Sequence, residues 1–179
     1  MTVLTPILPG QVDTLRTILR GYGAGRDSPL SHVPDIQFAR WVVIDQLRTQ
    51  WPGAPKSIPH LTSPYLLFTA DVTAPAYRAQ ELPGSFFRDL IHLMPAESDR
   101  VWSKCQDFPG VDDADTFAEY LERGRIGTGL YYAAYPDDTA QDIRRALDIR
   151  QSLVSFVRQH QSDPKSPELK EKYLTEYAP

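Results

Sequence analysis

Short apolar runs along the chain have the composition and spacing of β-strands. Three runs are β-branched, aromatic or apolar and end at Gly, Pro or Asp, which predicts strands at residues 2–8, 36–44 and 65–72. The segment 127–135 is rich in aromatic residues and is bounded by Gly and Pro, which predicts a fourth strand.

Other stretches have apolar residues three and four positions apart, the spacing that marks one face of a helix. The predicted helices begin near Gln11, at Ser85, around Val101, at Asp112 or Asp113, and near Thr139, and the last of them ends near His160. Several helices therefore separate the third predicted strand from the fourth.

The order of these elements indicates the fold class. Strand, helix, strand, strand, helices, strand and helix follow one another as in a split βαβ arrangement. We expect an α+β fold: a ferredoxin-like antiparallel sheet with helices on one face and extra helices inserted before the last strand. This domain would span residues 1–160, and residues 161–179 would form a polar C-terminal arm or a short helix.

The second predicted strand, residues 36–44, is apolar at both alternating sets of positions. Such a strand is typical of a sheet that is covered on both faces. The helix-free face could be covered by the same face of a second subunit, in a homodimer such as a dimeric α/β barrel. Coverage by the long loops of the same chain is the alternative, and the sequence favours neither.

Composition and charge narrow the classes of partner. The 179 residues carry a net charge of −4 with both signs interspersed, so we expect no nucleic acid as a partner. The chain has one cysteine, Cys105, which excludes an intrachain disulfide and predicts a small buried apolar residue. No signal peptide and no run long enough to span a bilayer is visible, so we expect a cytoplasmic protein without a membrane partner.

The strongest candidate for a binding residue is Arg40, a guanidinium in the middle of an apolar strand. If buried, it must find an anion or several carbonyl groups, and Asp71 in the next strand is the expected partner. The pair is then either a structural ion pair or an anchor for an anionic group of a substrate. Trp41 follows directly and, with Asp71, is a candidate substrate-binding residue.

Two further groups of residues have functional and structural interpretations. His32 and His60 lie in the two long loops, where general acids or bases and axial haem ligands are often found. Tyr131 and Tyr132 either pack in the core or line a pocket for a flat apolar ligand. No two histidines have the spacing of a metal site, so we predict none, and haem is the one cofactor considered.

Two strand segments resemble those of a known family. Residues 38–45 read Phe-Ala-Arg-Trp-Val-Val-Ile-Asp and residues 66–71 read Leu-Leu-Phe-Thr-Ala-Asp. Together with Leu4-Thr5-Pro6-Ile7-Leu8-Pro9-Gly10, they are similar to an uncharacterised bacterial ferredoxin-like family that is sometimes associated with haem peroxidases. The resemblance covers roughly residues 2–158, but Gln37 stands where the family has a histidine. It implies the fold more strongly than a reaction.

The leading functional hypothesis is a small-molecule-binding protein that acts as an enzyme of bacterial secondary or oxidative metabolism on an apolar or aromatic substrate. In it, Arg40 orients an anionic or carbonyl group, and His32 or His60 moves a proton. The alternative is a non-catalytic, dimerising interaction module or an accessory partner of a haem peroxidase.

Overall fold

The computed structural model describes most of the chain. The described residues are 1–23, 25–33, 36–47, 53, 61–72, 83–127, 129–130, 138–160, 170–171 and 173–175. The chain divides into two compact units, Met1–Ala140 and Gln141–Pro179. That residues 1–160 fold as one domain stays a prediction.

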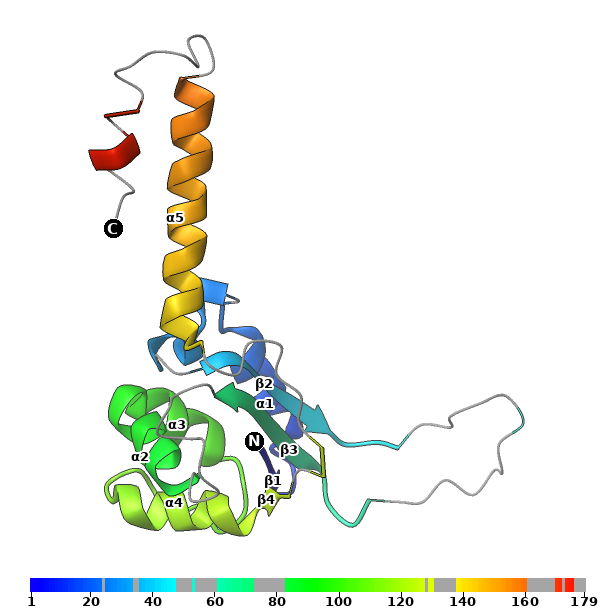
Figure 1. Cartoon of the computed structure of the whole chain (residues 1–179). Helices are drawn as coiled ribbons and strands as arrows, with labels where there is room; N and C mark the ends of the chain where they lie inside the picture. Colours follow the sequence, from blue (N-terminus) through cyan, green and yellow to red (C-terminus); the bar gives the residue numbers. More distant parts are fainter. Residues whose placement is uncertain are drawn as a thin grey trace. The chain divides into compact units, whose positions relative to one another are not determined.

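The first unit contains a four-stranded antiparallel sheet (Figure 1). Its strands are β1 (Thr2–Pro6), β2 (Ile36–Ile44), β3 (Tyr65–Val72) and β4 (Arg125–Ile126), in the spatial order β2-β3-β1-β4. The predicted bounds of β2 and β3 are confirmed. β1 and β3 are the central strands, and β2 and β4 form the two edges.

Helices connect the strands and follow the last of them (Figure 1). In chain order they are α1 (Val12–Arg20), the 3₁₀ turns η1 (Gly25–Asp27) and η2 (Pro29–His32), α2 (Pro83–Leu93), α3 (Pro95–Trp102), α4 (Ala114–Arg123) and α5 (Ala140–Gln159). α2, α3 and α4 are the predicted insertion before the last strand. The structure is therefore α+β with an open antiparallel sheet.

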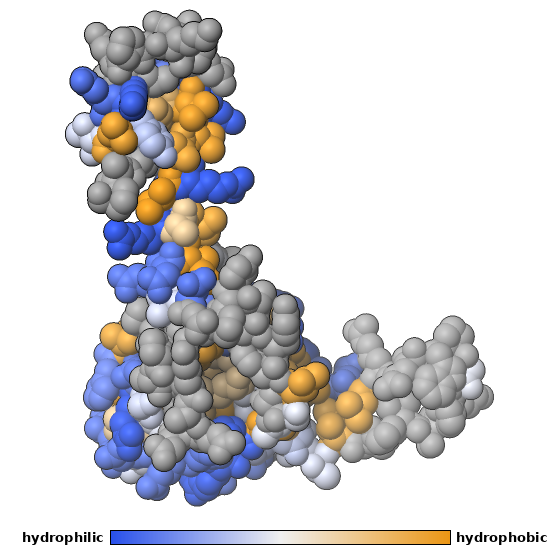
Figure 2. Space-filling view, viewed as in Figure 1, coloured by the Kyte–Doolittle hydropathy of each residue, from blue (hydrophilic) through white to orange (hydrophobic). Residues whose placement is uncertain are grey.

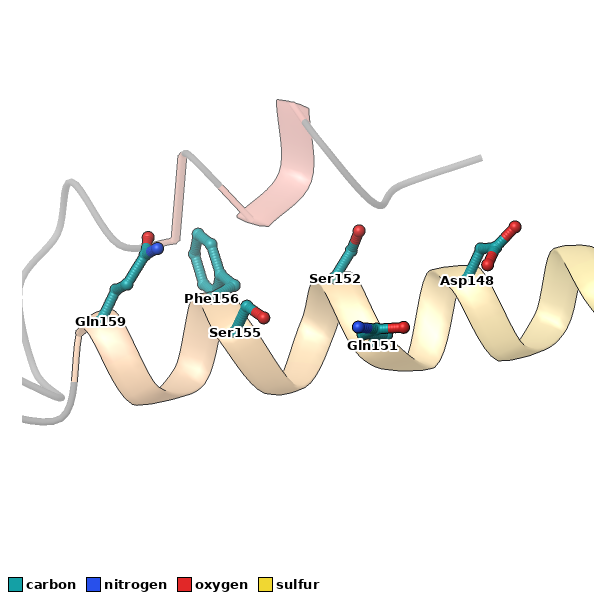
Figure 3. Close-up of a pocket in the computed structure, with 6 residues that line it drawn as sticks. All are labelled: Asp148, Gln151, Ser152, Ser155, Phe156 and Gln159. Atoms are coloured by element: carbon teal, nitrogen blue, oxygen red, sulfur yellow. The ribbon is translucent and has the colours of Figure 1, made fainter.

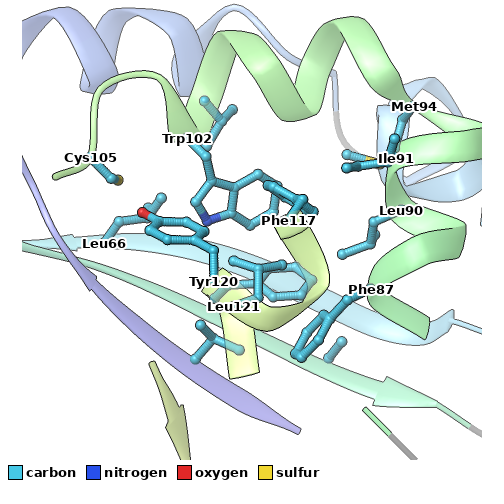
Figure 4. Packing of buried hydrophobic residues seen from close by; sticks show 14 of the residues in the cluster. Leu66, Phe87, Leu90, Ile91, Met94, Trp102, Cys105, Phe117, Tyr120 and Leu121 are labelled. Atoms are coloured by element: carbon cyan, nitrogen blue, oxygen red, sulfur yellow. The ribbon is translucent and has the colours of Figure 1, made fainter. Parts of the chain in front are cut away.

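One face of the sheet is buried against the helices. Burial alternates along β3, where Leu66, Phe68 and Ala70 are buried and their neighbours are half-buried. These side chains join those of β1 and α1–α4 in one hydrophobic core (Figure 4). Because successive side chains of a strand point to opposite faces, the other residues of β3 lie on the face away from this core.

Trp102, at the end of α3, is the centre of the aromatic packing in this core. It is fully buried, and its ring makes edge-on contacts with Trp41, Phe68 and Phe117 at centroid distances of 5.9, 5.7 and 5.4 Å. Edge-to-face packing at such distances is favourable for aromatic pairs. Trp102 thereby connects a strand pair to the helical layer.

The exposure of β2 within a single chain varies along the strand. β2 is an edge strand, and Gln37, Phe38 and Arg40 are exposed, Phe38 to 54%. The remaining residues from Trp41 to Ile44 are half-buried. Coverage of the second face by another subunit or by the long loops stays a prediction.

Most of the last predicted strand lies outside the described residues. β4 contains only Arg125 and Ile126, which lie before the predicted segment 127–135. Gly127, Gly129 and Leu130 are outside any strand, and residues 128 and 131–137 lie outside the described residues.

The second unit is built on α5, whose predicted extent is confirmed to within a residue at each end. Phe156 is the one residue of α5 that is buried among those described, and its ring lies 6.4 Å from that of Tyr173 in the short helical stretch 173–175. Figure 2 shows apolar side chains on the surface of α5, and they include Leu147, Val154 and Val157. Among the described residues of the chain, no helix has the length and apolar character to cross a membrane.

The aromatic core yields a prediction about stability. Replacing Trp102 with alanine should lower the free energy of unfolding by about 3–5 kcal/mol, because a large buried side chain leaves a cavity. Phe38→Ala removes an exposed ring and should cost less than about 1 kcal/mol. Urea unfolding followed by far-UV circular dichroism measures both, and equal losses would contradict the described packing.

Candidate functional site

The face of β2 and β3 that points away from the core carries charged and polar side chains next to exposed aromatic surface. In the strand register, Arg40 lies opposite Thr69, and Phe38 lies opposite Asp71. Residues directly opposite each other in an antiparallel pair lie on the same face of the sheet. These four side chains therefore share one surface, which we call the Arg40 surface.

Arg40 is held in place across the strand pair. Its Nε donates a hydrogen bond to Thr69 Oγ1 at 3.2 Å, and its guanidinium carbon lies 6.0 Å from the centre of the Phe38 ring. Within the described part of the chain, no partner is found for its two terminal nitrogens. An exposed guanidinium whose Nε is fixed can bind a carboxylate by donating hydrogen bonds from its terminal N–H groups.

The predicted ion pair between Arg40 and Asp71 is not found among the ion pairs of the described residues. Asp71 lies opposite Phe38, two residue pairs further along the ladder than Arg40 and Thr69. The negative charge of Asp71 instead attracts the amino group of Met1. That amino group donates a hydrogen bond to the carbonyl oxygen of Ala70 at 2.8 Å. Burial lowers the pKa of that amino group, and the charge of Asp71 opposes this shift.

Trp41 does not belong to the Arg40 surface. It follows Arg40 in a regular strand, so its side chain points to the opposite face, where its ring packs 5.8 Å from Phe68 and 6.1 Å from Tyr22. Its Nε1 is buried and lacks a hydrogen-bond partner in the described structure. The structure thus separates two residues that the sequence suggested for one site.

The remaining predicted site residues are only partly described. His32 is exposed at the end of η2, a turn that contacts β2. His60, Tyr131 and Tyr132 lie outside the described residues. Their proposed roles remain predictions.

Cys105 is confirmed as a buried residue, which argues against a nucleophilic thiol. Thr5 Oγ1 donates to its Sγ at 3.4 Å, and the side chain lies under β1 near the ring of Tyr120 (Figure 4). Burial raises the pKa of the Cys105 thiol to about 11. At neutral pH the thiolate, which is the reactive form, is therefore scarce.

Comparison with known proteins found no relative. No family model matches the chain, and no curated protein and no solved structure is significantly similar to it. The resemblance of residues 38–45 and 66–71 to a ferredoxin-like family therefore stays a prediction.

The sequence analysis missed a polar hollow on the second unit. It has a volume of about 440 Å³ and is lined by one side of α5 (Figure 3): Asp148, Gln151, Ser152, Ser155, Phe156 and Gln159. The spacing of these Gln and Ser residues along one helical face was the available signal. Among the described residues no group of three or more His, Cys, Asp or Glu side chains could hold a metal ion.

The buried thiol makes a prediction about pH dependence. Because the folded protein holds Cys105 protonated to about pH 11, whereas an unfolded thiol ionises near pH 9, the free energy of unfolding should fall as pH rises between these values. Cys105→Ser removes this ionisation and should reduce the slope of stability against pH in that window. Urea unfolding between pH 8 and 11 compares the two proteins, and identical slopes would contradict the assignment.

Proposed function

We propose that the Arg40 surface binds a small ligand that has an anionic group attached to an apolar or aromatic body. The observation that carries this proposal is the placement of Arg40 by Thr69 beside the exposed ring of Phe38. Cation and apolar surface lie next to each other, so one small molecule can contact both.

The hydrogen bond to Thr69 determines how an anion would approach. It occupies Nε, so the two terminal nitrogens remain for the oxygens of the ligand. A planar pair of N–H donors matches the two oxygens of a carboxylate. Thr69 belongs to β3, a central strand paired on both sides, which supports a fixed orientation of the guanidinium.

Asp71 favours a ligand with a single negative charge. Its carboxylate lies on the same face as Arg40, two residue pairs away, and would repel a second negative charge nearby. Phe38 offers a ring that is half exposed for contact with the body of the ligand. These features support an aromatic or aliphatic monocarboxylate as the ligand class.

The proposal extends to catalysis in the form suggested by the sequence, an enzyme of secondary or oxidative metabolism. Arg40 would orient the anionic group, and His32 would supply a proton-transfer group. His32 is assigned this role because it is exposed and lies in the turn that precedes β2. We also propose that the sheet is of the ferredoxin-like type, because antiparallel strands, α1 between β1 and β2, and α5 after β4 agree with that order.

Benzoate is a suitable probe for the charge requirement. We expect ¹⁵N chemical-shift perturbations of the β2 and β3 amides on titration with benzoate, and binding at least about 10-fold weaker for neutral benzamide. Arg40→Gln should weaken benzoate binding about 10-fold or more, and Arg40→Lys should restore part of it, because a point charge lacks the planar fork. Equal affinity of benzoate for the wild-type protein and Arg40→Gln would overturn the proposal.

Asp71 provides a test in the opposite direction. Asp71→Asn removes a negative charge from the Arg40 surface and should strengthen benzoate binding about 3-fold at low ionic strength, with the gain lost at high salt. Thr69→Val removes the acceptor of the Nε hydrogen bond and should weaken binding. The same titration measures both variants, and a loss of affinity in Asp71→Asn would show that Asp71 assists the anion rather than repels it.

A further inference from the structure

Among the strands that the structure describes, β2 has the longer free edge. β2 is nine residues long, whereas β4, at the other edge, has two. No described segment pairs with the outer side of β2. A strand in this position presents a row of backbone N–H and C=O groups that another extended chain can pair with.

The sequence of β2 carries few of the features that usually protect a free edge. Proteins block such edges with proline, with charged side chains, especially lysine, or with bulges. Between Phe38 and Ile44 there is no proline and no lysine, the one charged residue is Arg40, and the one irregularity of the ladder lies earlier, between Ile36 and Phe38. The regular stretch is therefore available for pairing.

We propose that β2 pairs in antiparallel fashion with β2 of a second copy of the chain. Among the described residues, β4 offers two for pairing with β2 of another copy, whereas β2 offers the whole regular stretch Phe38–Ile44 to a second β2. Pairing of β2 with itself uses the same surface on both copies, so a two-fold axis closes it as a dimer rather than a fibre.

The charge pattern selects the register of this pairing. The regular stretch Phe38–Ile44 is centred on Trp41, and a two-fold axis there places Arg40 opposite Val42 of the second copy. A two-fold axis at Arg40 would instead place two guanidinium groups directly opposite each other, which is destabilising. With the axis at Trp41, Phe38 lies opposite Ile44 of the second copy, so apolar residues face each other at the ends.

This dimer differs from the one considered from the sequence. Edge pairing extends the sheet sideways and leaves the face that carries Arg40 accessible, whereas a dimer through the helix-free face would cover it. The inference does not depend on the proposed ligand, because it rests on the position and composition of β2.

Substitutions at Val42 test both the dimer and its register. Sedimentation velocity should show a species of twice the 20.3 kDa monomer mass at micromolar concentration. Val42→Lys places a cation opposite Arg40 of the second copy twice per dimer and should raise the dissociation constant roughly 10-fold. Val42→Glu places a carboxylate there and should lower it.

Leu67→Lys is the matched control. Leu67 lies opposite Val42 within the sheet, on the same face but in the central strand β3. Leu67→Lys should change the dissociation constant of the edge dimer by less than about 3-fold, whereas it would abolish a face-to-face dimer. Circular dichroism confirms folding of each variant, and if Val42→Lys does not fold, Val42→Glu and Leu67→Lys still decide. A monomeric wild-type protein, or a dimer that Leu67→Lys abolishes and Val42→Glu does not strengthen, would overturn the proposal.

Discussion

The arrangement of this protein depends on one constraint, the alternation of side chains in the ladder between β2 and β3. Trp41 and Phe68 are opposite each other and belong to the aromatic packing around Trp102. Their neighbours Arg40 and Thr69 must then lie on the other face of the sheet. A shift of one residue would bring the guanidinium of Arg40 into the aromatic core, where an unpaired charge is very costly.

This register also explains why the Arg40 surface can act as a binding surface. The core fixes the backbone of both strands from one side. The Cα atoms that carry the side chains of the other face are therefore fixed as well. Thr69 is on a central strand and fixes the guanidinium of Arg40 through Nε. The edge position of β2 leaves Arg40 and Phe38 exposed at the same time. Packing on one face and access on the other are thus two consequences of the same ladder.

Local sequence patterns predicted the elements well because they depend on local chemistry. The runs 36–44 and 65–72 are strands with the predicted bounds, and Asp113 caps α4 through a hydrogen bond that its side chain accepts from the amide of Asp115. Local patterns could not predict that β2 lies at the edge of the sheet, because this position depends on which strands become neighbours. Its apolar composition predicted coverage on both faces, by a second subunit or by the long loops, and that stays a prediction.

The partner of Arg40 shows the same limit at the level of single residues. Asp71 was expected from charge alone, but the ladder places Thr69 opposite Arg40, and the irregularity between Ile36 and Phe38 that sets this register is not visible in the sequence. By contrast, the separation of Arg40 from Trp41 follows from the period of two in a strand, and the sequence alone could have shown it.

The alternation along β2 can be measured directly with single cysteines in a Cys105→Ser background. Cysteines at positions 38 and 40 should react with a thiol reagent much faster than cysteines at 39 and 41, because only the first pair lies on the open face. Rates that do not alternate, or faster labelling at 39 and 41, would contradict the account.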